Sequence, residues 1–160
     1  MDILLRQAAG RALTEVLHPW LNVGVSAAEP GSLVPAEGTG PGWQASVALC
    51  GNRITGEVRL HLSEEFVREA WGRLFGEPGA DSGGVEANRD FVGELTNMVA
   101  GRVAILLGEL GYPCQLGTPV VSFAAVRPGI PSHAPDTVRT EWICGGHWLT
   151  LDLRCFPEGT

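Results

Sequence analysis

A long stretch without proline, residues 90–110, is the feature that most constrains the fold of this chain. Most of its residues favour helix, and Gly111 and Pro113 follow it, so the sequence predicts one long helix that ends near residue 110. Because an α-helix turns by about 100° per residue, six apolar side chains should share one side. They are Val92, Leu95, Val99, Val103, Leu106 and Leu110. This side is the expected core stripe, against which the rest of the fold should pack.

The opposite side of the predicted helix carries Asp90, Glu94 and Asn97 at i, i+4 and i+7, followed by Gly101 and Gly108. A glycine inside a helix costs about 1 kcal/mol relative to alanine, but its bare backbone lets a partner come close. Carboxylates four residues apart are also common on ordinary helices. Spacing alone therefore favours a solvated face, with a functional face as the alternative.

The pattern Asp90-x-x-x-Glu94-x-x-Asn97 resembles the signature helix of the CheC/CheX/FliY family of chemotaxis phosphatases. Residues 111–121 also resemble the return from helix to strand in that family, and the whole resemblance covers about residues 54–121. The CheX-like branch fits best, because only one such helix is readable.

The resemblance implies a phosphatase that acts on the aspartyl phosphate of a phosphorylated CheY-like receiver domain. It implies that Asn97 positions the attacking water and that Glu94 docks the lysine of the receiver. Asp90 and Gly101 would then be partner contacts. No cofactor of its own is implied, since the receiver supplies Mg²⁺, and CheX-like proteins pair through strands into a homodimer.

Two alternatives from other classes stay open. In a non-catalytic module that only binds the receiver, Glu94 would matter and Asn97 would not. In a scaffold protein, this helix face would be a dimer contact.

Length and charge limit the other possibilities. With 160 residues the chain fits one domain, residues 1–160. Its net charge of -7 argues against binding to nucleic acid or to an anionic membrane. Arg6, Gln7 and Arg11 interrupt the apolar positions near the start, so no signal peptide or membrane span is predicted there. We therefore expect a cytoplasmic protein.

The cysteines and histidines lack the spacing of a metal site. No Cys-x-x-Cys is present, no two histidines lie three or four residues apart, and the one cysteine–histidine pair at i, i+3, Cys144 with His147, is not repeated elsewhere. We therefore predict no metal site and expect buried, reduced thiols. Phosphate-loop, dinucleotide and Gly-x-Ser-x-Gly motifs are also missing, so any chemistry must come from the long helix.

Shorter elements should surround the long helix. An amino-terminal amphipathic helix is expected to stop at His18-Pro19, followed by a strand within residues 21–27 and a loop over residues 29–42. Residues 43–50 and 54–62 predict a β-hairpin, with His61 on its solvated face.

A second helix should begin after Ser63 as N-cap and end at Gly76. Its expected buried stripe is Phe66, Ala70, Trp71, Leu74 and Phe75. A linker over residues 77–84 leads into residues 85–90, which should add one or two turns to the front of the long helix.

The chain should finish with strands. One is expected over residues 120–126, and a Gly145-Gly146 turn should join residues 137–144 to residues 147–156 in a hairpin. Asp152 and Arg154 are expected to face solvent, and Trp142 and Trp148 to make core or dimer contacts. The order of elements predicts an α/β (α+β) sandwich, with an antiparallel or mixed sheet and helices on one face. The CheC-like fold implied by the resemblance has the same architecture.

Overall fold

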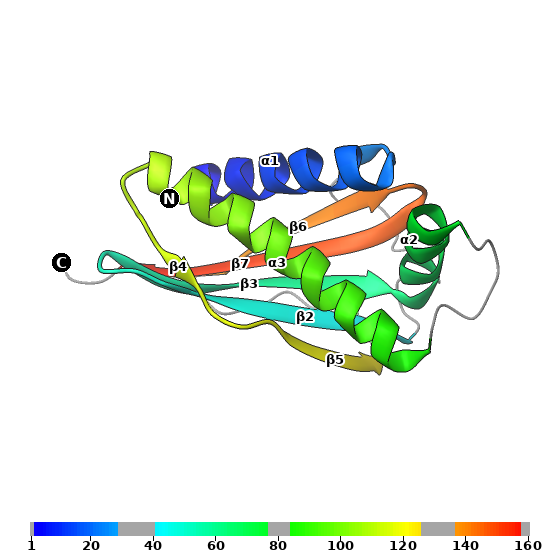
Figure 1. The fold of residues 1–160 in the computed structure, drawn as a ribbon. Helices are drawn as coiled ribbons and strands as arrows, with labels where there is room; N and C mark the ends of the chain where they lie inside the picture. The colour runs from blue at the N-terminus through cyan, green and yellow to red at the C-terminus, as the bar shows by residue number, and fades with distance from the viewer. Residues whose placement is uncertain (1, 29–40, 77–83, 126–136, 158–160) are drawn as a thin grey trace.

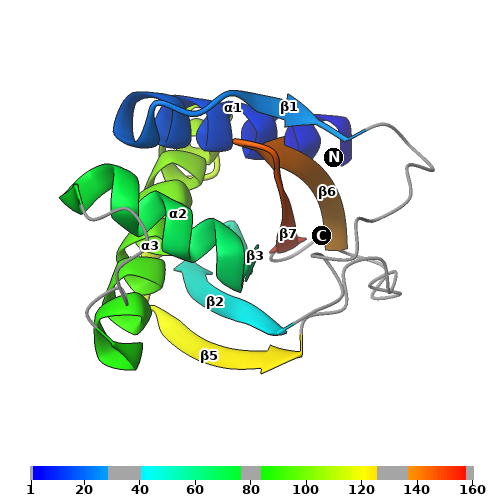
Figure 2. The ribbon, with the colours of Figure 1, turned by 90° about the vertical axis from the view of Figure 1, so that its right-hand side faces the viewer.

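The protein is an α+β sandwich in which three helices cover one face of a strongly curved sheet (Figures 1 and 2). The structure, a computed structural model, describes residues 2–28, 41–76, 84–125 and 137–157. The helices are α1 (Asp2–Leu21), α2 (Glu64–Phe75) and α3 (Val85–Glu109). The strands are β1 (Val25–Ala27), β2 (Pro41–Cys50), β3 (Ile54–Ser63), β4 (Gln115–Leu116), β5 (Val120–Ala125), β6 (Thr137–Cys144) and β7 (His147–Pro157). The predicted fold class is confirmed.

All strand pairs in the described sheet are antiparallel. The order is β1-β6-β7-β3-β2-β4, and β5 also pairs with β2. Both predicted hairpins are present, as β2 with β3 and as β6 with β7. The short strand β4 was not predicted. Most of the loop predicted for residues 29–42 and of the linker predicted for residues 77–84 lies outside the described residues.

Alternation along the central strands builds the core. On β2 and β3 the side chains that point toward the helices are buried and paired across the ladder. They are Trp43 with Leu62, Ala45 with Leu60, and Val47 with Val58. Burial of these apolar side chains, at about 25 cal/mol per Å² removed from water, holds the helix layer on the sheet.

Local signals explain the boundaries of α2. Ser63 caps the helix by accepting a hydrogen bond from the Phe66 amide at 3.1 Å, as predicted. Gly76 ends it in the left-handed conformation, with φ of 72°. Phe75 was wrongly predicted to be buried and is 58% exposed. Its ring lies on Trp71 with a centroid distance of 4.2 Å, because the last residue of the helix is beyond the edge of the core.

The predicted end of α1 at His18-Pro19 is also wrong, because the helix continues to Leu21. Pro19 lies in the last turn, where the missing N–H removes only one intrahelical hydrogen bond. Burial of Leu17 and Leu21 offsets that loss. The helix ends where Asn22 takes a φ of 52° and its amide donates to the His18 carbonyl.

Candidate active site

Helix α3 is the element that carries the candidate site, and it crosses the sheet diagonally between α1 and β5 (Figure 1). It spans Val85–Glu109, so the prediction that residues 85–90 extend the long helix is confirmed. Five of the six predicted stripe residues are buried, whereas Leu110 is 44% exposed. Leu110 follows the last helical residue, and its side chain therefore leaves the line of the stripe.

The predicted site residues share the side of α3 that points away from the core. Asp90 and Glu94 are exposed, and Asn97 and Gly101 are half-buried. Asn97 lies at the border of this face rather than at its centre, because the turn of about 100° per residue puts it on the side of Gly93. We call the surface formed by Asp90, Glu94, Asn97 and Gly101 the polar face of α3.

The polar groups of this face have no partners among the described residues. Neither Asp90 nor Glu94 forms an ion pair there, and the Asn97 carboxamide makes no hydrogen bond. Some other carboxylates of the surface are paired within the chain, as Glu57 is with Arg59 and Glu69 with Arg73. The polar face therefore presents two carboxylates and one carboxamide that are free to bind another molecule.

The glycine on this face is not required by the packing of the chain itself. A Cβ added at Gly101 would meet only Leu116 Cδ1, at 3.7 Å, which is an ordinary van der Waals contact. At Gly108 an added Cβ would meet nothing within 4 Å. A small side chain at Gly101 would therefore clash with no other described part of the chain.

On the side toward α1, an ion-pair cluster fixes the middle of α3. Arg102 contacts Glu15, which also pairs with Arg11 at 3.2 Å. The hydrogen bond from Arg102 holds the pKa of Glu15 below its ordinary value. Three residues further on α1, His18 Nδ1 lies 3.2 Å from the Val23 carbonyl. Both Glu15 and His18 are therefore already occupied by contacts within the chain, Glu15 with Arg102 and Arg11 and His18 with the Val23 carbonyl.

An aromatic cluster, missed by the sequence analysis, holds the first half of α3. Phe91 stacks on Trp20 of α1, with ring centroids 5.5 Å apart, and meets the edge of Trp71 of α2 at 6.1 Å. No local pattern in the sequence brings these three aromatic residues together. The cluster ties α3 to both other helices directly behind Asp90 and Glu94.

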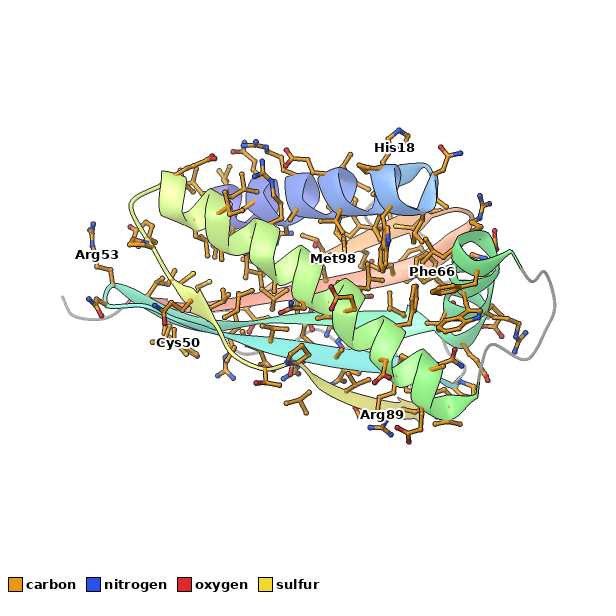
Figure 3. The ribbon with its side chains drawn as sticks, in the orientation of Figure 1. His18, Cys50, Arg53, Phe66, Arg89 and Met98 are labelled. Carbon is orange, nitrogen blue, oxygen red and sulfur yellow. The ribbon has the colours of Figure 1, made fainter. Side chains whose placement is uncertain are left out.

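The opposite flank of α3 is tied to the sheet edge. Arg89 Nη1 donates to the Val121 carbonyl of β5 at 3.0 Å, and the Arg89 side chain lies at the β5 end of the helix (Figure 3). Gly93 lies close to Val121 and Pro119. Met98, on the other flank, lies between α3 and α1 (Figure 3). Each flank of the polar face thus contacts a different layer of the fold.

The helix-free face of the sheet departs from the sequence prediction. Asp152 was expected to face solvent and is only 6% exposed, because Arg139 and His61 from the neighbouring strands contact its carboxylate. The solvated imidazole predicted for His61 is therefore wrong as well. Arg154 is exposed, as expected. Trp142 packs against the core cluster, as predicted, whereas Trp148 is buried but is not part of that cluster.

No group of three or more metal-binding side chains occurs within the part of the chain that the structure describes. Cys144 and Cys155 are buried, and burial raises the pKa of each thiol to about 12. The expectation of a buried thiol is wrong for Cys50, which is exposed at the end of β2.

Helix α3 is long and apolar enough to span a membrane by length and composition. In the fold, however, 56% of its most apolar window is buried against other elements. This burial is typical of the core helix of a folded domain.

Comparison with protein families adds a sequence match to this geometry. Residues 44–125 match the family described as chemotaxis phosphatase CheX. The matched span is just over half of the chain and contains the polar face of α3. No curated protein matches the chain significantly.

Solved structures share the fold over nearly the whole chain. CheX from Vibrio vulnificus is 18% identical, with a TM-score of 0.77, and the match covers 95% of this chain and 99% of that one. A chain in the CheX-CheY-BeF3-Mg complex from Borrelia burgdorferi is 14% identical, with a TM-score of 0.67, and the match covers 94% of this chain and 97% of that one. FliY from Thermotoga maritima is 19% identical, with a TM-score of 0.59 and coverage of 94% and 84%.

Proposed function

The chain belongs to the CheX family of chemotaxis phosphatases, and from this premise we propose that it hydrolyses the aspartyl phosphate of a CheY-like response regulator. The observation that carries the proposal is the polar face of α3. Glu94 and Asn97 lie one turn apart on a rigid helix, and neither side chain is engaged by another described residue. The Borrelia burgdorferi relative in complex with CheY supports a CheY-like partner.

Hydrolysis of the acyl phosphate requires few catalytic groups from this chain. A receiver domain stores its signal as an acyl phosphate beside its own Mg²⁺ and lysine, which supply most of the electrostatic stabilisation of phosphoryl transfer. Hydrolysis then requires a water held in line with the phosphorus. The water forms a bond to phosphorus as the bond to the aspartyl oxygen breaks, which yields inorganic phosphate and the free aspartate.

Asn97 is suited to hold that water. A carboxamide accepts a hydrogen bond through its oxygen and donates through its nitrogen, so it can contact the water and a phosphoryl oxygen together. Orientation of the reactants is itself a large part of catalysis. The half-buried position of Asn97 limits the directions in which its side chain can point.

Glu94 is suited to dock the receiver. Its exposed carboxylate can pair with the lysine of the receiver without first breaking an ion pair within this chain. Asp90 lies one turn earlier, at the rim of the same face, and would add a further contact. Gly101 leaves room for the loops around the acyl phosphate. Mg²⁺ belongs to the receiver in this proposal, and the chain contributes no cofactor.

The sheet supports a proposal about assembly. Among the described strands β5 pairs only with β2, so its outer edge is open. Val120 is 68% exposed on this strand. An open edge can pair with a strand of a second copy, and we propose a homodimer formed through strands. A cytoplasmic location fits the proposed receiver substrate.

The test is dephosphorylation of a panel of phosphorylated receiver domains from the same organism, with and without this protein. We expect at least one receiver to lose phosphate faster in its presence, and only with Mg²⁺. Faster loss with the parent but not with Asn97→Ala assigns the activity to the polar face. Asn52→Ala, in the exposed turn after β2, is the matched control and should act like the parent. Binding of a receiver without any acceleration would instead support the non-catalytic module.

A further inference from the structure

The first half of α3 lacks the usual anchor of a helix start. Gly84 occupies the N-cap position and provides no side-chain hydrogen bond to the free amides of the first turn. Val85 and Glu86 are exposed, so the first turn has little packing of its own. Contacts with other elements of the fold must therefore fix the part of the helix that carries Asp90 and Glu94.

Two contacts with the β5 side provide that anchor. The Arg89 guanidinium donates to the Val121 carbonyl at 3.0 Å, and this bond joins residues 32 positions apart in the sequence. One turn later, Gly93 is buried against the same strand. A Cβ there would lie 3.3 Å from Val121 Cγ2 and 3.8 Å from Pro119 Cβ, so glycine permits a close approach of α3 to this edge.

These contacts lie in line with Asn97. Gly93 precedes Asn97 by one turn, and at about 100° per residue the two positions lie roughly 40° apart around the helix axis; Gly93 is the one that faces Pro119 and Val121. On the other flank, Phe91 is held by Trp20 and Trp71. The first half of α3 is therefore held by contacts on both flanks, and the polar face lies between these two sets of contacts.

We propose that Arg89 and Gly93 are positioning residues. By holding α3 against β5, they fix how far Asn97 and Glu94 extend toward the bound receiver. We call Arg89, Gly93, Pro119 and Val121 the α3–β5 clamp. This inference rests on the proposed phosphatase function. Neither Arg89 nor Gly93 touches the acyl phosphate; both act through the helix that presents Asn97.

The consequence is a defect in turnover rather than in docking. A misplacement of about 1 Å in a reacting group can cost on the order of a hundredfold in rate. Binding through one flexible carboxylate, such as Glu94, tolerates a small shift better. Loss of the clamp should therefore lower kcat more than it raises KM.

The test compares two graded series with matched controls. Arg89→Ala should lower kcat about tenfold or more, and Arg89→Lys should recover part of it, because an ammonium group can still donate to the Val121 carbonyl. Gly93→Ala should lower kcat slightly and Gly93→Val strongly, as the added atoms push α3 away from Val121. Arg68→Ala on α2 and Gly24→Ala, where a Cβ would meet nothing within 4 Å, should match the parent.

Hydrogen exchange supplies a measurement that does not depend on activity. In Arg89→Ala the amides of residues 85–97 should exchange faster, while those of α1 stay unchanged. Unchanged kcat in both Arg89→Ala and Gly93→Val, or unchanged exchange in α3, would overturn the clamp. A fall in kcat matched by a general loss of stability, with no recovery in Arg89→Lys, would also overturn it. If the parent dephosphorylates no receiver, the proposed function fails, whereas the exchange of residues 85–97 still decides whether the clamp exists.

Discussion

Arg139 and Asp152 form a bidentate ion pair between β6 and β7, in which the Nε–Oδ1 and Nη2–Oδ2 distances are both 2.7 Å. His61 Nε2 from β3 approaches the same carboxylate at 3.3 Å. The cluster joins three adjacent strands on the sheet face that no helix covers, and Asp152 is nearly fully buried. The pair therefore fixes the part of the sheet formed by β3, β6 and β7 without belonging to the candidate site.

Asp152→Asn should destabilise the fold without a direct effect on chemistry. The substitution removes the carboxylate charge from the pair that Asp152 forms with the half-buried Arg139 guanidinium, at a cost of about 3 kcal/mol. Chemical denaturation at neutral pH measures this loss, and Glu65→Gln, an exposed carboxylate on α2, is the matched control. A free energy of unfolding equal to that of the parent would contradict the assigned role of the pair.

The same carboxylate predicts a dependence of stability on pH. Burial opposes ionisation of Asp152, but hydrogen bonds from Arg139 and His61 outweigh burial and lower its pKa from 3.8 to about 2. A folded-state pKa below the unfolded value gives stabilisation that is fully present above pH 3.8 and is lost as the pH falls toward about 2. The parent should therefore lose up to about 2 kcal/mol more than Asp152→Asn over this range. Unfolding free energies of the two proteins that run parallel between these pH values would contradict the prediction.

Glu94→Gln should weaken binding of the phosphorylated receiver. The change removes one charge and keeps the shape, and loss of a charge pair in a partly desolvated interface costs about 2 kcal/mol. Titration should show an affinity at least about tenfold lower, with a weaker dependence on salt. Glu65→Gln serves again as the control, since it removes the same charge from a different helix. Equal affinity of Glu94→Gln and parent would show that Glu94 does not dock the receiver.

Gly101→Leu separates a docking role of this glycine from a packing role. Leucine favours helix over glycine by about 1 kcal/mol, and the Cβ position has only an ordinary contact with Leu116. The melting temperature should therefore hold or rise while the dephosphorylation rate falls, because the side chain enters the approach path of the receiver. Gly108→Leu, further along the helix, should raise stability in the same way. A variant at Gly101 that melts higher and works normally would exclude this part of α3 from the docking surface.

Local signals in the sequence predicted most of the fold. The period of α3, the Ser63 cap and the Gly145-Gly146 turn act over a few residues, and each is present in the structure. The polar face was predictable for the same reason, because side chains at i, i+4 and i+7 share one side of any helix.

Long-range contacts account for the errors and omissions. Asp152 looked solvated because alternation along β7 shows which face it is on, but not that Arg139 and His61 close over it from adjacent strands. The stacking of Phe91 on Trp20 and the bond from Arg89 to Val121 likewise depend on how distant elements meet. Pro19 was expected to end α1 because the burial of Leu21 against the core is not visible in the local pattern.

The central claim is that the Asn97 carboxamide positions the water that attacks the acyl phosphate. The most direct measurement is the rate of phosphate loss from a saturating phosphorylated receiver with parent protein and with Asn97→Ala, together with the affinity of each for the receiver. We predict that Asn97→Ala binds the receiver with parent affinity and leaves its phosphate to decay at the unassisted rate. Acceleration by Asn97→Ala equal to that of the parent would contradict the claim.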